Sequence, residues 1–433
     1  MKIKILKPVT AIAIAMLFTA CNNVPAAVVT DTVPEIQNTT TSAPAEITTV
    51  GETTVDEAMF EGKEYRLPAT YETLPNLKDV FADDFYLGTA INTFQLEEGT
   101  DTYNLALKHF NIFTTENEMK PVYVNPSEGV FDFAAPDKFI AFGDANPDAI
   151  LRGHTLVWHS QAPEWWFKGS GEGGRATSDE LMARMTEYIN TTVGRYKGKI
   201  KYWDVVNEAF SDSTGQLRQL HEQSYWAPII GDLDGDGDEY DFIEQAFYLA
   251  READPDAKLI INDYNLEQDP RKLNGFYDAV KSMLEQGVPI DGVGIQAHIQ
   301  LEWPSIINFK MAIEKLATLK EINPDLIIQV TELDVSMYAW SDQSLTVDMN
   351  AENETKLAVR YADLFDMFRE EAAKGNLETV VMWGFYDGMS WLNDYPIPGR
   401  TNHPLLFDRD LIAKPAFWGV VDRTKIDAAV EEE

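Results

Sequence analysis

Two glutamates are candidates for chemistry because each follows a short β-type run and has polar neighbours. Glu208 follows Asn207 directly, and Glu332 lies two residues before Asp334. A pair of carboxyl groups cleaves a glycosidic bond when one donates a proton to the leaving oxygen and the other, ionised, attacks the anomeric carbon. A lone glutamate in such a place is more often a solvated residue or a helix cap. The surrounding residues therefore decide whether the pair is functional.

Other polar and aromatic residues follow similar short runs. Amides, imidazoles and carboxylates are costly to bury unless they pair with one another or serve a ligand. Indole rings stack on the apolar faces of sugar rings, while amide, amine and carboxylate groups hydrogen-bond the hydroxyls. Each residue alone could be an ordinary core or surface residue. Together they favour a carbohydrate site, and they are Glu116, Asn117, Lys120, His154, Trp158, Gln161, Gln296, His298, Trp383 and Trp391.

These residues need a fold that brings them to one place. From Met59 to about residue 427, short β-type runs alternate with longer helical patterns, which indicates repeated βα units. Helices are expected at 179–196, 241–253, 273–286, 307–322 and 355–373. Strands are expected at 86–92, 112–115, 150–158, 202–207, 258–262, 292–296, 327–331 and 380–385. Eight alternations favour a closed (β/α)₈ TIM barrel, in which the carboxyl ends of the strands form the site.

The sequence argues against several other classes of function. No G-x-G-x-x-G follows a predicted strand, which disfavours a doubly wound nucleotide-binding fold. Phosphoryl transfer lacks a Gly-rich phosphate loop, and metal-dependent hydrolysis lacks an H-E-x-x-H or comparable spacing. The net charge of -36 repels phosphate backbones but leaves a neutral polysaccharide unaffected, so nucleic acid is a poor partner. The same charge could also serve only to keep a secreted protein soluble.

The N-terminal segment has the pattern of an export signal. Three lysines among the first seven residues precede an apolar run at 11–18, which is too short to span a bilayer. Small residues then precede Cys21, the only cysteine of the chain, so residues 1–21 resemble a bacterial lipoprotein signal in which Cys21 is lipidated. An ordinary signal peptide that removes Cys21 is the alternative. Residues 22–58, rich in Thr, Ala, Val and Pro, are expected to be a disordered linker, and 428–433 an acidic tail.

The chain resembles glycoside hydrolase family 10, the β-1,4-xylanases. The matching segments appear in the family's order and cover nearly everything from about residue 70 to 425. They are 115–120 (TENEMK), 152–161 (RGHTLVWHSQ), 203–208 (WDVVNE), 262–265 (NDYN), 291–298 (DGVGIQAH), 331–335 (TELDV), Trp383-Gly384 and Ser390-Trp391. The resemblance implies endo-acting hydrolysis of xylan by a retaining double displacement, without a cofactor. We expect xylan and xylo-oligosaccharides as partners, a monomer, and a location that is secreted or lipid-anchored to the bacterial cell envelope.

The resemblance also implies a role for each site residue. Glu208 would be the acid/base and Glu332 the nucleophile. Asn207 would bond the 2-hydroxyl of the sugar under attack, and Gln296 would lie beside Glu208. His298, paired with Asp334, would orient the nucleophile. The sugars on the non-reducing side would be bound by Glu116, Asn117, Lys120, His154 and Gln161, between cleft walls formed by Trp158, Trp383 and Trp391.

Three segments depart from the family pattern. Pro121 stands where the family usually has Trp, so the loop after the second strand is expected to differ. Phe385 and Tyr386 replace the commoner Val-Thr, which puts the contacts to the reducing side in doubt. An insert at 232–241 (DLDGDGDEYD) begins like an EF-hand loop but has Ile243 at the twelfth position. It is either a structural calcium site or an acidic solvent loop, and its candidate ligands are Asp232, Asp234, Asp236 and Asp238.

Two further hypotheses use the same features. A cellulase, or another endo-hydrolase of β-1,4-glucans, would have the same barrel. A non-catalytic xylan-binding surface protein would keep the cleft but lose the chemistry. The presence of both glutamates together with Asn207 and His298 argues against the second hypothesis.

Overall fold

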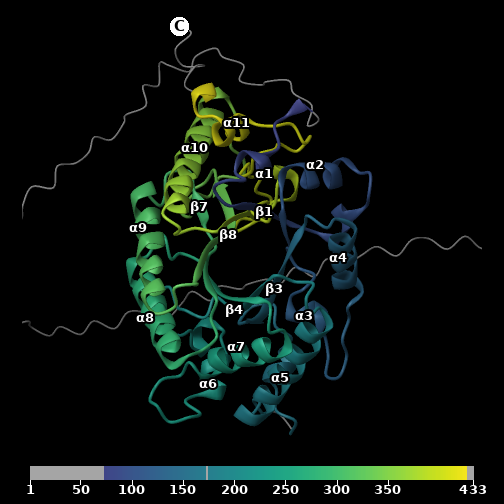
Figure 1. Ribbon diagram of the computed structural model, residues 1–433, viewed down its shortest axis with the longest axis vertical. Coiled ribbons are helices and arrows are strands. Elements are labelled where there is room, and N and C mark those ends of the chain that lie inside the picture. Colours follow the sequence, from purple (N-terminus) through teal and green to yellow (C-terminus); the bar gives the residue numbers. More distant parts are fainter. Residues whose placement is uncertain (1–72, 172–173, 427–433) are drawn as a thin grey trace, which may run out of the picture. The chain divides into compact units, whose positions relative to one another are not determined.

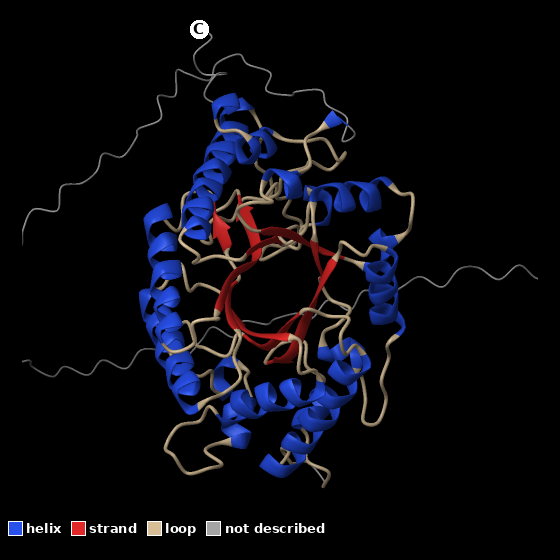
Figure 2. Cartoon of the chain, viewed as in Figure 1, coloured by secondary structure: helices blue, strands red, loops and turns tan. Residues whose placement is uncertain are grey.

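The computed structural model describes residues 73–171 and 174–426. Parallel strands form a closed ring that is surrounded by helices (Figure 2). The ring closes because β1 pairs with both β2 and β9, and β6 pairs with β8. The strands are β1 (Tyr86–Ile91), β2 (Ile112–Thr115), β3 (Ile150–Trp158), β4 (Tyr202–Asn207), β5 (Lys258–Asp263), β6 (Gly292–Ile295), β7 (His298–Gln300), β8 (Ile327–Ser336) and β9 (Thr379–Met382). The predicted (β/α)₈ barrel is confirmed.

β6 and β7 are two segments of one barrel strand. β6 pairs with the first half of β8, and β7 pairs with its second half. Between them lie Gln296 and Ala297, and Ala297 has a φ of 64°, in the left-handed region that interrupts a strand. The described barrel therefore has eight strand positions, and the interruption falls beside Gln296 and His298.

The strand predictions are confirmed, with differences at the ends. The second, third and fourth strands match to the residue. The strand predicted at 327–331 continues to Ser336, because β7 provides a second partner for the longer β8. The strand predicted at 380–385 ends before Trp383, because Gly384 has a φ of 105° and turns the chain away.

Helices cover the outside of the barrel, and α9 and α10 lie next to each other along one side (Figure 1). The helix predicted at 307–322 is shorter: α9 ends at Ala317 and continues as a 3₁₀ helix, Thr318–Glu321. The α-helices are α1 (Leu77–Val80), α2 (Asp101–His109), α3 (Pro121–Val124), α4 (Ala134–Ala145), α5 (Ser178–Arg195), α6 (Trp226–Ile230), α7 (Asp241–Ala253), α8 (Pro270–Gln286), α9 (Ile306–Ala317), α10 (Ala351–Ala373) and α11 (Pro415–Val421).

Local sequence sets where the helices begin and end. At the start of α5, the Thr177 hydroxyl accepts from the Glu180 amide (3.2 Å) and the Glu180 carboxylate accepts from the Thr177 amide (2.8 Å). This capping box satisfies two amide groups that have no partner within the helix. α8 begins with Asp269 as its cap and Pro270 at the first position, and it ends at Gly287, whose φ is 87°.

The interior of the barrel contains a buried ion pair between Arg152 on β3 and Asp204 on β4. Arg152 and Asp204 are each 1 % exposed, and the guanidinium donates to the Asp204 carboxylate and to Gln329. His154, two residues after Arg152 on β3, places Nδ1 2.9 Å from Asp204 Oδ2. Removing one partner of such a pair typically costs about 3–5 kcal/mol, because the other charge stays buried. The ion pair thus fixes His154 at the floor of the cleft.

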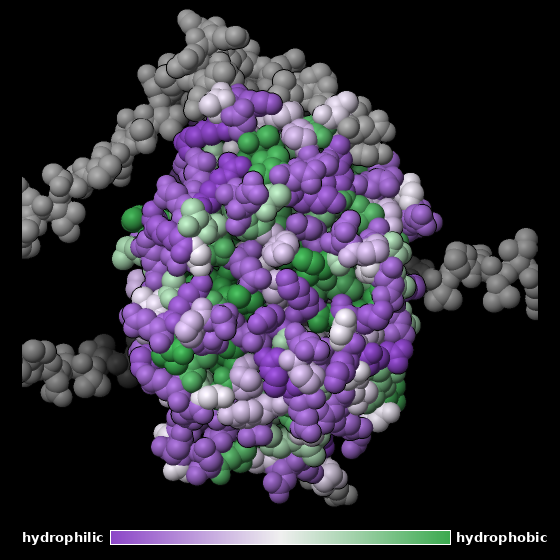
Figure 3. Space-filling model, viewed as in Figure 1, coloured by the Kyte–Doolittle hydropathy of each residue, from purple (hydrophilic) through white to green (hydrophobic). Residues whose placement is uncertain are grey.

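The face of the molecule seen in Figure 3 is mostly hydrophilic, with hydrophobic residues in small separate areas. All described residues belong to one compact unit. Within the described ranges, no helix combines the length and the apolar character that a bilayer span requires.

Candidate active site

Glu208 lies directly after β4, at the carboxyl end of the barrel. Its φ of 56° is in the left-handed region, which costs a non-glycine residue about 1–2 kcal/mol. Two hydrogen bonds hold the Glu208 backbone in this conformation. The Glu208 amide donates to the Asn262 carbonyl (2.9 Å), and Arg218 Nε donates to the Glu208 carbonyl (2.8 Å). Glu208 Oε1 accepts from Gln296 Nε2 (3.0 Å) and Asn207 Nδ2 (3.3 Å). Oε2 bonds to no described residue, which leaves it for a substrate.

Glu332 lies within β8 and is 4 % exposed. Its Oε1 accepts from Asn262 Nδ2 (2.8 Å), and its Oε2 lies 3.3 Å from His298 Nε2. Burial alone would raise the pKa of Glu332, but the charges of His154, His298 and Lys120 and the bond from His298 lower it to about 2. The carboxylate is therefore ionised at neutral pH.

Three buried amides join the two carboxylates. Asn207 Oδ1 accepts from Asn262 Nδ2 (2.9 Å) and from Gln296 Nε2 (3.2 Å). The Asn262 amide also donates to Glu332, and the Gln296 amide also donates to Glu208. All three amides are at most 2 % exposed. We call this set, Asn207, Asn262 and Gln296, the amide bridge; it fixes the two carboxylates relative to each other.

His298 connects Glu332 to a second carboxylate. Its Nδ1 lies 3.0 Å from Asp334 Oδ2, which also accepts from Trp391 Nε1 (2.7 Å). Burial lowers the pKa of His298, but the charge and hydrogen bond of Asp334, followed by those of Glu332, raise it to about 10. His298 is thus an imidazolium at neutral pH, and it keeps a positive charge against Glu332.

Lys120 organises one side of the cleft. Its Nζ donates to Asn117 Oδ1 (3.0 Å) and Gln161 Oε1 (2.9 Å), and it lies 5.0 Å from the centre of a Trp158 ring. Burial raises the pKa of Glu116, which lies on the same side. Amine, amide and carboxyl groups beside an indole face suit the hydroxyls and apolar face of a sugar ring.

A cavity of about 500 Å³ brings these groups together. It is lined by every residue predicted to be catalytic or to bind sugar, except Asn207 and Asp334, which contact its lining residues. The predicted residues in its wall are Glu116, Asn117, Lys120, His154, Trp158, Gln161, Glu208, Gln296, His298, Glu332, Trp383 and Trp391.

Comparison with known proteins identifies the family. Residues 76–423 match the sequence profile described as glycosyl hydrolase family 10. The chain belongs to glycosyl hydrolase family 10. Its barrel is therefore that of a glycosyl hydrolase, with one glutamate directly after β4 and another within β8.

Curated relatives of this family 10 chain carry xylanase names. Endo-1,4-beta-xylanase C of Paenibacillus barcinonensis is 43 % identical over 82 % of this chain, which spans only 32 % of that larger protein. An endo-1,4-beta-xylanase of Geobacillus stearothermophilus is 41 % identical over 81 % of this chain and 99 % of its own length. A solved GH10 structure from Paenibacillus barcinonensis superposes with a TM-score of 0.78, at 43 % identity, over 82 % of this chain and 99 % of that one.

The cavity of this family 10 chain is also lined by residues to which the sequence alone assigned no role. Tyr264 and Asn265 follow β5, so the rule that strand ends carry the site would have found them. Trp340 and Tyr395 come from loops without a motif, and only the folded chain brings them to the cleft. The additional lining residues are His159, Ser160, Tyr264, Asn265, Trp340 and Tyr395.

The family departures after β2 and β9 have simple structural outcomes. Pro121 occupies the first position of α3, where a missing amide hydrogen is no loss, and Lys120 directly before it still lines the cleft. Phe385 is buried, and neither it nor Tyr386 is among the described residues that line the cavity. The replaced side chains therefore do not form the cleft wall.

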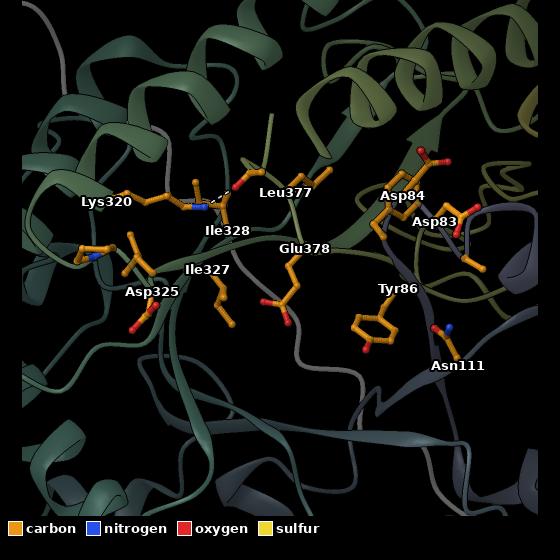
Figure 4. Close-up of a pocket in the computed structure, with 15 residues that line it drawn as sticks. Asp83, Asp84, Tyr86, Asn111, Lys320, Asp325, Ile327, Ile328, Leu377 and Glu378 are labelled. Carbon is orange, nitrogen blue, oxygen red and sulfur yellow. Dashed lines mark hydrogen bonds between the residues drawn. The ribbon is translucent and has the colours of Figure 1, made fainter. Parts of the chain in front are cut away.

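A second cavity, slightly larger at about 600 Å³, lies where the strands begin. Figure 4 shows Glu378 there, between Tyr86 and Ile327. Tyr202 donates to Glu378 Oε1 (2.7 Å). None of the predicted site residues lines this cavity. In (β/α)₈ enzymes the amino-terminal face contributes to stability and the carboxyl-terminal face carries the chemistry, so the smaller cavity is the candidate active site.

The acidic insert forms a different group from the predicted one. Asp232 and Asp234 come together with Asp241, and each offers a carboxylate oxygen within 4.8 Å of the others. Asp236 and Asp238 do not belong to this group, because the chain turns into α7 at Asp241 and brings that side chain in instead.

The predictions for the chain ends fall outside the described residues. These are the signal at 1–21 with Cys21, the linker at 22–58 and the acidic tail at 428–433.

Proposed function

We propose that the chain is an endo-β-1,4-xylanase that cleaves xylan with retention of configuration, with Glu332 as nucleophile and Glu208 as acid/base. The observation that carries this proposal is the amide bridge, which fixes an ionised Glu332 opposite Glu208 in one cavity. Relatives that match nearly the whole barrel are named endo-1,4-beta-xylanases, which supports xylan as the substrate.

The charge state of Glu332 favours a nucleophile over a base. An inverting enzyme needs a carboxylate that removes a proton from water, whereas a retaining enzyme needs one that attacks carbon and later leaves. A carboxylate whose pKa is about 2 is a weak base and a good leaving group. The charges of His154 and His298 and the hydrogen bond from His298, which depress this pKa, therefore support double displacement.

The reaction would proceed in two steps. In the first, Glu332 attacks the anomeric carbon while Glu208 gives its proton to the glycosidic oxygen, so the C–O bond breaks and a glycosyl ester forms on Glu332. In the second, Glu208 takes a proton from water, and the hydroxide attacks the same carbon and releases Glu332. Asn207 would bond the 2-hydroxyl while it donates to Glu208, which couples sugar binding to the position of the acid.

Xylo-oligosaccharides should be cut at least about 100-fold faster, in kcat/KM, than cello-oligosaccharides of equal length. Xylose lacks the C6 hydroxymethyl group, and Trp391 and Gln161 line the cavity. We expect these walls to admit xylose and to overlap the hydroxymethyl group of glucose. The measurement is hydrolysis of xylohexaose and cellohexaose under identical conditions.

The same assay separates the competing functions. Equal kcat/KM values on the two hexasaccharides would make the chain a broad β-1,4-glucanase and overturn the specificity. Binding of xylohexaose without any release of reducing sugar would make it the non-catalytic xylan-binding protein.

We also propose that the chain is exported and anchored to the cell envelope through a lipid on Cys21. The sole cysteine follows an apolar run and small residues, and a thiol at that place is the acceptor of a lipoprotein signal. The net charge of -36 and a neutral polymer substrate suit an enzyme that works outside the cytoplasm.

Cys21→Ser should move the enzyme from the membrane fraction to the soluble fraction, because the lipid acceptor is lost. The measurement is xylanase activity in the two phases of a detergent partition of whole cells. Lys63→Ser, a change outside the signal, is the control and should stay in the detergent phase. Unmodified enzyme that already partitions into the aqueous phase would refute the anchor.

A further inference from the structure

The acidic insert between α6 and α7 is built as a turn around carboxylates. In Figure 1 it belongs to the lower part of the picture, where it connects α6 to α7. Asp232 Oδ1 accepts from the Gly235 amide (2.6 Å), and its Oδ2 accepts from the Gly237 amide (3.1 Å). Both glycines have positive φ, 80° and 100°, and Gly237 holds the sixth position counted from Asp232. A glycine at the sixth position makes the sharp turn of a calcium loop.

Three carboxylates meet where this turn joins α7. Asp232, Asp234 and Asp241 bring an oxygen each to within 4.8 Å of one another. Asp241 is the first residue of α7, and its Oδ2 accepts from the Leu233 amide (3.1 Å). The insert is thereby folded back onto the start of the helix.

Glu244 is a second, independent observation beside this turn. It lies in the first turn of α7, three residues after Asp241 and hence on the same side of the helix. The residue is only 8 % exposed, and its buried Oε1 has no hydrogen-bond partner among the described residues.

These carboxylates have no cationic partner within the described part of the chain. Among the described residues, no lysine, arginine or histidine forms an ion pair with Glu244 or with any aspartate of the insert. A buried carboxylate without a partner is costly, and clustered carboxylates repel one another. A cation that binds oxygen ligands would remove both penalties.

We propose that the insert binds one calcium ion, with Asp232, Asp234 and Asp241 as ligands and Glu244 as the closing carboxylate. The twelfth residue of an EF-hand loop supplies a carboxylate ligand. In this insert the twelfth residue is Ile243, which is buried in the core, and the next residue, Glu244, supplies the carboxylate instead. Calcium accepts six to eight oxygen ligands in flexible geometry, whereas magnesium requires a near-ideal octahedron. An irregular group of carboxylates therefore suits calcium.

Calorimetric titration of the EDTA-treated full chain with calcium chloride tests the site directly. We expect one ion per chain with a Kd below about 1 mM, within the range of calcium loops. The melting temperature in 10 mM calcium should exceed that in EDTA by about 2–5 °C. Sodium chloride of equal ionic strength should not reproduce this rise. Absence of both binding heat and a calcium-specific rise would overturn the proposal.

Two variants and a control assign the ligands. Asp232→Asn combined with Asp234→Asn should abolish binding, whereas Asp148→Asn, at an exposed carboxylate elsewhere, should bind as the unmodified chain does. Glu244→Gln should weaken calcium binding at least about tenfold, since a charged ligand is lost. In EDTA it should melt no lower than the unmodified chain, because the uncompensated charge is gone. Unchanged affinity in Glu244→Gln would refute Glu244 as a ligand.

Discussion

Glu332→Ala is expected to lower kcat on every β-xyloside by at least about 10⁴-fold. The nucleophile acts in both half-reactions, so an acidic leaving group cannot compensate for its loss. Glu332→Gln should show the same loss with the same side-chain volume, because an amide does not attack the anomeric carbon. The measurement is kcat on xylan and on an aryl xylobioside with an acidic phenol.

Controls separate lost chemistry from lost structure. Glu128→Ala, at an exposed glutamate outside the cleft, should keep the activity of the unmodified chain. With Glu332→Ala, added azide can enter from the side of the missing carboxylate and should yield an α-glycosyl azide from the aryl substrate. A Glu332→Gln enzyme whose kcat on xylan stays within about tenfold of the unmodified chain would exclude Glu332 as the nucleophile.

Glu208→Ala should behave differently on different leaving groups. On xylan kcat should fall about 10²–10⁴-fold, because the departing sugar needs a proton. On the aryl xylobioside the first step needs no acid, so Glu332 should still form the glycosyl ester. The expected result is a fast burst of phenol followed by slow turnover, measured by stopped-flow absorbance.

Azide completes the test of Glu208. It needs no general base, so it should speed the slow turnover of Glu208→Ala and give a β-glycosyl azide, the opposite anomer to that from Glu332→Ala. Equal loss of activity on xylan and on the aryl substrate, without a burst and without rescue by azide, would show that Glu208 is not the acid/base.

Much of the barrel can be predicted from the sequence because strand and helix periods alternate regularly along it. The ends of β8 and β9 could not be predicted, because they depend on tertiary contacts. β8 extends to Ser336 only because β7 pairs with it, and β9 stops where Gly384 adopts a positive φ. The ends of these strands are set by contacts between distant segments of the chain, and the residues within one segment do not reveal such contacts.

The site could be predicted where its residues follow strands and not where they come from loops. Glu208 and Glu332 carry local signals, but nothing in the sequence around Trp340 or Tyr395 indicates that they reach the cleft. The low pKa of Glu332 also needs the fold, since it arises from His154, His298 and Lys120, which lie on three different strands or loops. In the acidic insert, the place of Asp241 depends on where α7 begins.

The configuration of the first product tests the central claim most directly. Proton NMR of xylohexaose hydrolysis, recorded before mutarotation, distinguishes the α and β anomers of the new reducing end. Double displacement through Glu332 predicts that the β anomer appears first and that the α anomer grows only as the sugar mutarotates. An α anomer as the first product would mean single displacement by water, and it would contradict the assignment of Glu332 as nucleophile.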